Sequence, residues 1–545
     1  MDSPVLPLHW PPQLVRLMIN PQALTAAIVL SVVVPLVLRW ITSYQSIPKI
    51  TSSKSWFASR QDFAAHGVEI IENGFKQVKS GVFKVTALDG SDLVLLAPEH
   101  WLAICKKKDD EVAPARKEKF FLCDLHGAPF EEPFLYRYLA ARMPGFDRHL
   151  DVISQALDEG ISSVLDEGFN YSSGASRGVI MQPQILHVYS HVIWRVLLGD
   201  SFKSEVVDIF EKYSATLIPV MKALKAQRPM MARITAAFSG DVRKVNEQLD
   251  RATAFFAPIL EQCYQALEQG LSTSSVNNDW LEELVRMAPP DKRRDFKFLT
   301  NVLIGFAFTF VFSPGPSTTQ IVYEFAFRPD YVDDVLQEAH EVLGPQPDSW
   351  NFTRDSLRRL SLLDSFCKET HKHHPTAASN LMKKIHKTQT LPNGVVLPAG
   401  TVFEVVMTAA HLSNPSFEDP GQWNGRRYHE LRQKMPATAT GANKYDWGTA
   451  TRDDVNFGYA SHMCPGRWAG CSIAKMFLIK LLARYQIQPE DGEKERYKDF
   501  HSGQYVSVSK LYRVHQKHWS TERPWLTRFK ILPNPTKHIM IRPRN

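Results

Sequence analysis

The sequence predicts a mainly α-helical domain with a small β part, placed behind one N-terminal transmembrane helix. Three observations predict this fold class. An uncharged apolar run lies near the start of the chain, helical periodicity dominates residues 130–340, and β-rich runs flank a few turn signals. The 545 residues include 44% apolar and 22% charged residues, which is typical of a folded protein.

Residues 23–41 form the predicted transmembrane helix. The run from Ala23 to Leu38 reads ALTAAIVLSVVVPLVL, and with the next apolar residues it approaches the ~20 residues that a bilayer span needs. Several basic residues follow this run and only Arg16 precedes it, so the positive-inside rule predicts a lumenal N-terminus over 1–22 and a cytoplasmic remainder. A cleaved signal peptide is the alternative, disfavoured by the length of the run and the absence of a small-residue cleavage pattern.

The charge balance is mildly basic, with 64 Lys and Arg against 57 Asp and Glu. This excess suits an acidic protein partner or an anionic membrane surface, and it is too diffuse to predict nucleic-acid binding. The six cysteines are scattered without a CxxC pair, so a reducing compartment is expected rather than a disulfide framework.

A short polar linker is expected over residues 42–55, followed by one large domain over 56–545. The run FKVTALDGSDLVLLAP, from Phe83 to Pro98, predicts a β-hairpin in which Asp89-Gly90 forms a two-residue turn. Helices are predicted over 152–165, 206–224, 354–374 and 469–485, and two strands between 388 and 406.

A long apolar helical pattern covers residues 296–327 and is interrupted at Ser313-Pro314-Gly315-Pro316. Proline removes a backbone donor and kinks or ends a helix. The pattern therefore predicts either one kinked helix, or a helix that ends at Phe312 and a second that begins with Ser317 as its N-cap.

The stretch FGYASHMCPGR places Cys464 directly before a predicted helix. Backbone amides at the amino end of that helix can donate to the sulfur and lower the pKa of the thiol. Gly458 and Gly466 let the backbone pass close to a flat partner, and His462 and Arg467 offer donors on either side. A buried structural cysteine is the ordinary alternative, but these surroundings suit one thiolate that binds a large planar cofactor.

This stretch resembles the haem-binding loop of the cytochrome P-450 family, with the pattern F-x-x-G-x-[RH]-x-C-x-G. The resemblance implies a cytochrome P-450 fold, haem b as the cofactor and Cys464 as the axial thiolate ligand of the iron. It also implies that His462 binds a haem propionate. The expected cofactor-binding set is completed by Phe457, Gly458 and Arg467.

A second match lies in LDSFCKETHKHHP, where Glu369 and Lys372 fall at the family's E-x-x-R, and a third in DPGQWNGRRY, where Arg427 falls at its later arginine. The three residues are expected to support the cysteine-loop side. Lysine lacks the two-pronged contact of arginine, so a weaker ion lock is expected. A solvated basic face, rather than a metal site, is expected for the neighbouring histidines His371, His373 and His374.

Two further positions depart from the family pattern. Ala460 replaces the loop glycine, and if this position needs a positive φ, alanine costs about 1 kcal/mol. The family's central helix normally carries an acid–alcohol pair that delivers protons to bound oxygen. Phe312 falls at the acid position and Ser313 at the alcohol position, so Ser313 is the predicted proton relay.

The resemblance implies a monooxygenase anchored by a single span in the endoplasmic reticulum membrane, with its catalytic domain facing the cytoplasm. Electrons are expected from NADPH through NADPH-cytochrome P-450 reductase. The expected substrate is a hydrophobic small molecule, such as a terpenoid or polyketide intermediate of filamentous-fungal secondary metabolism. Two alternatives stay open: an isomerase, dehydratase, cyclase or peroxide-driven enzyme, favoured by the altered central helix, and a catalytically impaired haem-binding accessory protein.

Overall fold

The structure, a computed structural model, describes most of the chain after the predicted anchor. The described residues are 47–51, 56–116, 128, 130, 132–166, 176–227, 229–271, 279–435, 443–490, 492–497, 499 and 537–544. The predicted lumenal segment 1–22 and transmembrane helix 23–41 lie outside these ranges, as does most of the predicted linker.

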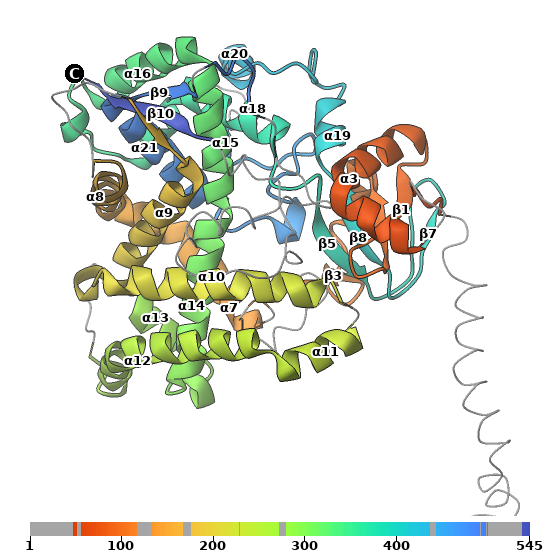
Figure 1. The fold of residues 1–545 in the computed structure, drawn as a ribbon, viewed down its shortest axis with the longest axis horizontal. Helices are drawn as coiled ribbons and strands as arrows, with labels where there is room; N and C mark the ends of the chain where they lie inside the picture. Colours follow the sequence, from red (N-terminus) through yellow and green to blue (C-terminus); the bar gives the residue numbers. More distant parts are fainter. Residues whose placement is uncertain are drawn as a thin grey trace, which may run out of the picture.

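The fold is mainly helical with a small β part, as predicted. Figure 1 shows a five-stranded sheet with α3 on the right and the larger helical part on the left. The helices are α3 (Trp56–Gln77), α4 (Pro98–Ile104), α7 (Pro133–Arg142), α8 (Leu150–Ile161), α9 (Met181–Leu198), α10 (Glu205–Lys225), α11 (Pro229–Phe238), α12 (Gly240–Glu268), α13 (Asp279–Met287), α14 (Phe296–Phe312), α15 (Pro314–Phe327), α16 (Pro329–Leu343), α17 (Arg354–Arg359), α18 (Ser361–His373), α19 (Thr408–Leu412), α20 (Arg427–Gln433) and α21 (Arg467–Arg484).

The strands form three small sheets in the described ranges. The five-stranded sheet has the order β1-β2-β8-β5-β3, the three-stranded sheet β4-β10-β9, and β6 pairs with β7. Three short strands, rather than the predicted two, therefore lie between 388 and 406. The bounds are β1 (Val82–Thr86), β2 (Asp92–Leu96), β3 (Val112–Pro114), β4 (Arg177–Val179), β5 (Ser379–Ile385), β6 (Gln389–Thr390), β7 (Val396–Leu397), β8 (Val402–Val406), β9 (Tyr485–Pro489) and β10 (Ile539–Pro543).

The predicted hairpin is confirmed as β1 and β2, but its turn is longer than predicted. The backbone N–H of Ala87 donates to the carbonyl oxygen of Ser91 at 2.8 Å, which leaves three residues in the loop. Gly90 ends the loop with a φ of +84°, a conformation that glycine adopts without steric cost. Three-residue hairpin loops commonly place glycine at this left-handed position.

The central apolar segment consists of two consecutive helices, α14 and α15, which run through the middle of the helical part (Figure 1). The second helix begins at Pro314, whose missing N–H costs little in a first turn. Ser317 is buried inside α15, so its prediction as the N-cap is wrong. The segment Phe296–Phe327 is long and apolar enough to span a membrane, but residues 315–326 are all buried, as expected for a core helix.

The predicted helix over 354–374 is interrupted at Leu360, which separates α17 from α18. The interruption has a tertiary cause that the local sequence does not show. The Glu338 carboxylate of α16 accepts hydrogen bonds from the backbone N–H groups of Leu362 (2.7 Å) and Leu363 (3.0 Å). A side chain from another helix thus satisfies the first amides of α18, where negative charge is favourable.

A buried ion cluster joins α15 to the end of α18 and to the segment near residue 499. His374 contacts Glu324 through Nε2 (3.1 Å) and Asp499 through Nδ1 (2.6 Å), and Arg496 pairs with both carboxylates. His371 is also buried, and His373 contacts Glu369, so the predicted solvated basic face is wrong. The histidines are instead enclosed, because packing of α18 against other elements supplies partners to His371 and His374, and Glu369 on the same helix supplies one to His373.

The pKa values in this cluster shift so as to favour its charged form. Burial opposes ionisation of Glu324, but His374 and Arg496 lower its pKa to about 2. Burial also opposes protonation of His374, but Asp499 and Glu324 outweigh burial and raise its pKa. The histidine's contribution to stability is therefore complete below its unfolded-state pKa and is lost as the pH rises through its folded-state pKa.

We predict that His374→Gln lowers the free energy of unfolding by about 3 kcal/mol at pH 6, because two buried carboxylates lose a cation. The difference from the wild type should shrink as the pH rises through the folded-state pKa of His374, because the ring loses its charge there. Denaturant titrations at several pH values measure this. His187→Gln is the matched control, since its pair with Glu211 (2.8 Å) is partly exposed and worth less than about 1 kcal/mol. An unchanged difference between pH 6 and pH 9 would contradict the assignment.

Candidate functional site

The cysteine loop is a closed turn held by its own backbone. The N–H of Cys464 donates to the carbonyl oxygen of Phe457 at 2.7 Å, which joins the two ends of the loop. Gly458 has a φ of +79°, and a Cβ there would lie 2.7 Å from the carbonyl oxygen of His462. Glycine is therefore required at 458 both for its φ and for this close approach.

Ala460 has a φ of +58°, so this loop position does need the left-handed conformation. In an L-residue other than glycine, the Cβ then crowds the following carbonyl oxygen. The alanine at this position therefore destabilises the loop by roughly 1 kcal/mol relative to glycine.

The Cys464 thiol lies at the amino end of α21, as the sequence predicts. Burial raises the pKa of this thiol, and the backbone N–H groups of Gly466 and Arg467, which donate towards Sγ, oppose the rise without cancelling it. The amides therefore lower the pKa of the thiol as predicted, but burial outweighs the amides and the Arg467 charge together, so the net pKa of the thiol is raised in the protein alone. A metal ion bound by Cys464 would supply the missing counter-charge, since a coordinating thiol is deprotonated outright.

The Cys464 side chain nevertheless keeps accessible surface. The sulfur is therefore desolvated by neighbouring groups and still accessible to a bound molecule. Together with the two inward-directed amides, this placement fits one axial thiolate of a planar iron cofactor. A zinc site needs further ligands, and the described residues contain no group of three or more metal-ligating side chains.

Basic side chains from two other segments lie near His462. Burial lowers the pKa of His462, and so do the charges of Lys383 on β5 and of Arg116, while Asp109, at 3.0 Å from its Nε2, raises it. These cations fit the carboxylates of a cofactor that reaches this side of the loop. Sequence analysis missed Lys383 and Arg116, because nothing in their local sequence distinguishes them from surface cations.

The Arg467 guanidinium donates to the backbone of the cysteine loop itself. Its Nη1 donates to the carbonyl oxygen of Cys464 at 2.8 Å. The guanidinium therefore clamps the cysteine backbone and places a positive charge near Sγ.

Glu369, Lys372 and Arg427 meet in a buried ion lock, as the sequence predicts. Arg427 Nε lies 3.1 Å from both carboxylate oxygens of Glu369, and Lys372 Nζ lies 3.5 Å from Oε1. Burial opposes ionisation of Glu369, but His373, Lys372 and Arg427 hold its pKa below the usual value. The lock joins α18 to α20. His371 of α18 also contacts the cysteine loop, since the centroids of the His371 and Phe457 rings lie 5.3 Å apart.

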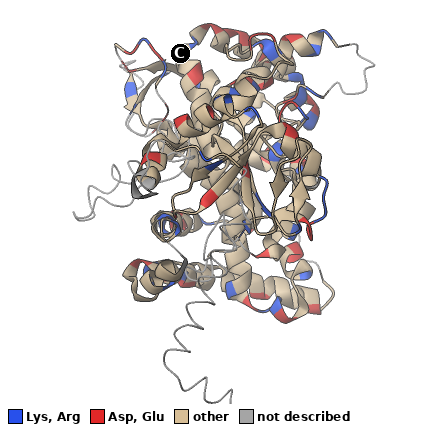
Figure 2. Cartoon of the chain, turned by 90° about the vertical axis from the view of Figure 1, so that its right-hand side faces the viewer, with Lys and Arg blue, Asp and Glu red and all other residues tan. Residues whose placement is uncertain are grey.

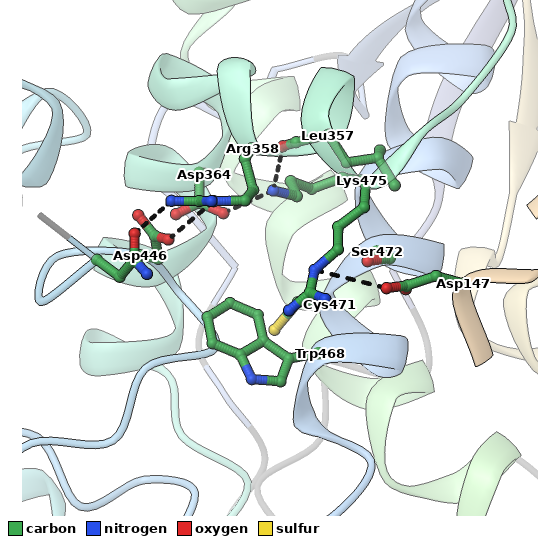
Figure 3. A pocket seen from close by; sticks show the side chains of 11 residues that line it. Asp147, Leu357, Arg358, Asp364, Asp446, Trp468, Cys471, Ser472 and Lys475 are labelled. Atoms are coloured by element: carbon green, nitrogen blue, oxygen red, sulfur yellow. Dashed lines mark hydrogen bonds and ion pairs between the residues drawn. The ribbon is translucent and has the colours of Figure 1, made fainter. Parts of the chain in front are cut away.

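A polar pocket opens beside α21 (Figure 3). A second buried carboxylate, that of Asp364, lines this pocket. Asp364 of α18 contacts Lys475 of α21 (2.7 Å) and Arg432 of α20 (2.9 Å). Burial opposes ionisation of Asp364, but these two cations keep its pKa below the usual value. The charged groups are paired with one another, so this pocket fixes α21 against α18 and does not provide an apolar chamber.

Ser313 lies at the break between α14 and α15 and has accessible surface, as has Thr309 one turn earlier. Thr309 donates its hydroxyl to the carbonyl oxygen of Gly305 at 2.8 Å, which satisfies it within the helix. The break is close to α21, since a Cβ at Gly470 would lie 3.9 Å from the Cβ of Pro314. The fold thus brings Ser313 near the helix that begins at the cysteine loop.

Aromatic rings line the neighbourhood of Ser313. Phe308 lies 4.5 Å from Phe312 and 5.0 Å from Phe130, measured between ring centroids, and Phe210 of α10 lies 6.3 Å from Phe312. Such a wall offers apolar contacts and no charge to a bound molecule. Elsewhere, acidic and basic residues are interspersed along the ribbon drawn in Figure 2, in keeping with the small net charge of +7.

We predict that Ala460→Gly raises the free energy of unfolding by about 1 kcal/mol, because glycine removes the left-handed strain. Denaturant unfolding followed by circular dichroism measures the change. Ala469→Gly, within α21, is the control and should instead destabilise by about 1 kcal/mol. A destabilised Ala460→Gly protein would show that the methyl group's contacts outweigh the strain.

Comparisons with known proteins agree with this site. A family model described as Cytochrome P450 matches residues 155–515. The chain is 25% identical over 325 residues to "Cytochrome P450 monooxygenase braC" of Annulohypoxylon truncatum, covering 59% of this chain and 63% of that protein. It is 26% identical over 261 residues to "Pyrichalasin C-7 hydroxylase" of Pyricularia grisea, covering 48% and 50% of the two chains.

A longer alignment joins the chain to "Cytochrome P450 monooxygenase ntnM" of Nectria sp, with 24% identity over 480 residues and 87% of each chain covered. The alignments with the first relatives span only about three fifths of their length, 63% and 61%. The family model covers well over half of the chain and includes the cysteine loop, so this chain belongs to the cytochrome P450 family.

Proposed function

We propose that this protein is a haem-thiolate monooxygenase that inserts one oxygen atom from O2 into a hydrophobic small molecule. The observation that carries the proposal is the accessible Cys464 thiol at the amino end of α21, with two backbone amides directed at its sulfur. Bound haem b would supply the activation of dioxygen. The second oxygen atom leaves as water, with two electrons taken from NADPH.

Each part of the site has a role in this proposal. Cys464 would ligate the iron, with the amides of Gly466 and Arg467 stabilising its negative charge. His462, Lys383 and Arg116 would bind the propionates. The aromatic wall around Phe312 would orient an apolar substrate and exclude water, and the Ser313 hydroxyl would hold a proton near the reacting atoms.

The substrate class and the partners belong to the same proposal. The fungal relatives, which include a hydroxylase and several monooxygenases, support a monooxygenase role in fungal secondary metabolism. A terpenoid or polyketide intermediate as substrate rests on the family resemblance alone. The reductase partner and the endoplasmic reticulum location rest on the family resemblance. The apolar run over 23–38 and the basic residues that follow it support a membrane anchor.

A second function is favoured by one observation, the phenylalanine at 312. Its ring occupies the position expected for an acid, and it packs on Phe308 rather than offering a proton. An isomerase, dehydratase, cyclase or peroxide-driven enzyme would not need that acid. Turnover without NADPH and reductase would support this second function.

We predict that the reduced, carbon-monoxide-bound protein has the strongly red-shifted Soret band of thiolate-ligated haem. Cys464→Ala should abolish this band, because the thiolate ligand is lost and every other cysteine in the described part of the chain is buried. Cys471→Ala is the matched control, since Cys471 is buried on α21 and should leave the band in place. A chain that binds no haem, or a Cys464→Ala protein with an unchanged band, would contradict the proposal.

We predict that Ser313→Ala lowers product formation by on the order of tenfold or more and releases peroxide, because a positioned proton donor is lost. Oxygen consumption, peroxide and product are measured together with reductase. Ser317→Ala, one turn later and buried, is the control. Ser313→Thr should retain coupling. Unchanged product formation by Ser313→Ala would show that Ser313 is not the proton relay. The carbon monoxide spectrum would still test the monooxygenase proposal.

A further inference from the structure

The Glu369 carboxylate is completely buried, and more than one group must therefore stabilise it. Its Oε1 atom lies 3.1 Å from Arg427 Nε, 3.2 Å from the backbone N–H of Asn424, 3.2 Å from His373 Nε2 and 3.5 Å from Lys372 Nζ. The contact from Lys372, which stands where the family places arginine, is the longest. The contact from His373 is shorter and comes from the next residue of the helix.

Arg427 cannot make up for the lysine, because its terminal nitrogens are already used. Nη1 donates to the carbonyl oxygen of Glu418 (2.5 Å), and Nη2 donates to those of Asp419 (3.1 Å) and Gln422 (2.6 Å). Only Nε of the guanidinium contacts Glu369, and the one other fixed donor to Oε1 among these contacts is the Asn424 backbone N–H. A second side chain with a planar donor would therefore help to hold the carboxylate in one orientation.

Lys372 is poorly suited to be that donor. Burial is the main cause that lowers the pKa of Lys372, although the charge of Glu369 opposes this effect. Its ammonium group also lies 5.7 Å from the centre of the Phe417 ring, so its position is shared between two partners. A lysine fixes distance and charge but not the angle of a carboxylate.

His373 has the geometry that Lys372 lacks. It lies four residues after Glu369, so the two side chains share one face of α18. The imidazole is rigid and planar, and an Nε2–H can donate to Oε1 in the neutral ring. The side chain is mostly buried, at 11% exposure, which protects the hydrogen bond from water.

We propose that His373 is a positioning residue, which replaces the missing arm of the arginine and fixes the Glu369 carboxylate behind the cysteine loop. The effect reaches the loop through the same helix. His371 accepts a hydrogen bond from Trp447 Nε1 (3.2 Å) and lies against Phe457, whose carbonyl oxygen accepts from the Cys464 N–H. This inference rests on the proposed haem-thiolate function only for its effect on the cofactor.

The test compares His373→Leu, Lys372→Arg and the double variant, all in the full-length protein. His373→Leu should increase the rate of haem transfer to an apoprotein acceptor on the order of tenfold, as loss of an outer-shell partner does, and should reduce the thiolate-ligated fraction of the carbon monoxide spectrum. Adding Lys372→Arg should restore both, because the guanidinium then supplies the planar donor. His191→Leu, which removes a histidine–glutamate contact of 2.9 Å on α9, is the matched control and should change neither.

Thermal unfolding of the haem-free chain separates the two proposals. His373→Leu should lower its midpoint and the double variant should recover it, whether or not haem binds. A wild-type chain that takes up no haem would contradict the proposed function, and the midpoints would still decide the role of His373. The inference would be overturned if His373→Leu kept the haem retention, the spectrum and the unfolding midpoint of the wild type. It would also be overturned if the double variant were no better than His373→Leu in these measurements.

Discussion

The rest of this structure depends on one buried carboxylate, that of Glu369. A carboxylate without water is stable only if cations and donors surround it, and a lost partner costs several kcal/mol. Helix α18, the residues before α20 and Arg427 are all brought together by this requirement. Arg427 then fixes residues 418–422 through their carbonyl oxygens, so the order of a whole irregular segment follows from one ion pair.

The same helix carries a second buried carboxylate, Asp364, which binds α20 and α21 through Arg432 and Lys475. The two carboxylates lie five residues apart in sequence and hold different elements. Together they make α18 a rigid support against which α21 is fixed. Because Cys464 lies at the start of α21, fixing this helix also fixes the position of the Cys464 sulfur. A metal ligand needs such a fixed position, since its distance to the iron must be kept.

At Cys464, burial disfavours the thiolate form that ligation of an iron requires. The enclosed site raises the pKa of the thiol, and the backbone amides recover only part of the cost. A site of this kind favours the thiolate when a metal ion shares the charge, so cofactor binding and thiol ionisation are coupled. The break at Ser313-Pro314 lies close to α21, and the interrupted helix there leaves the side chains of Thr309 and Ser313 exposed beside the rings of Phe308 and Phe312.

The sequence by itself determined the features that depend on short spacing. The cysteine loop with its left-handed Ala460, the hairpin, helix α21, the interruption of the central apolar helix and the meeting of Glu369 with Lys372 all follow from residues close together in the chain. Local rules of backbone geometry and helix periodicity suffice for these.

Only the tertiary structure decided which partners the buried charges find. The start of α18 depends on Glu338 from another helix, and His374 pairs with Asp499, 125 residues away. The histidines after Glu369 looked like a solvated basic face because the partners of His371 and His374, which are Trp447, Glu324 and Asp499, are distant in the sequence. Burial and pairing with distant residues set the charge, the pKa and the role of His371 and His374. No local sequence pattern encodes burial or these distant pairings.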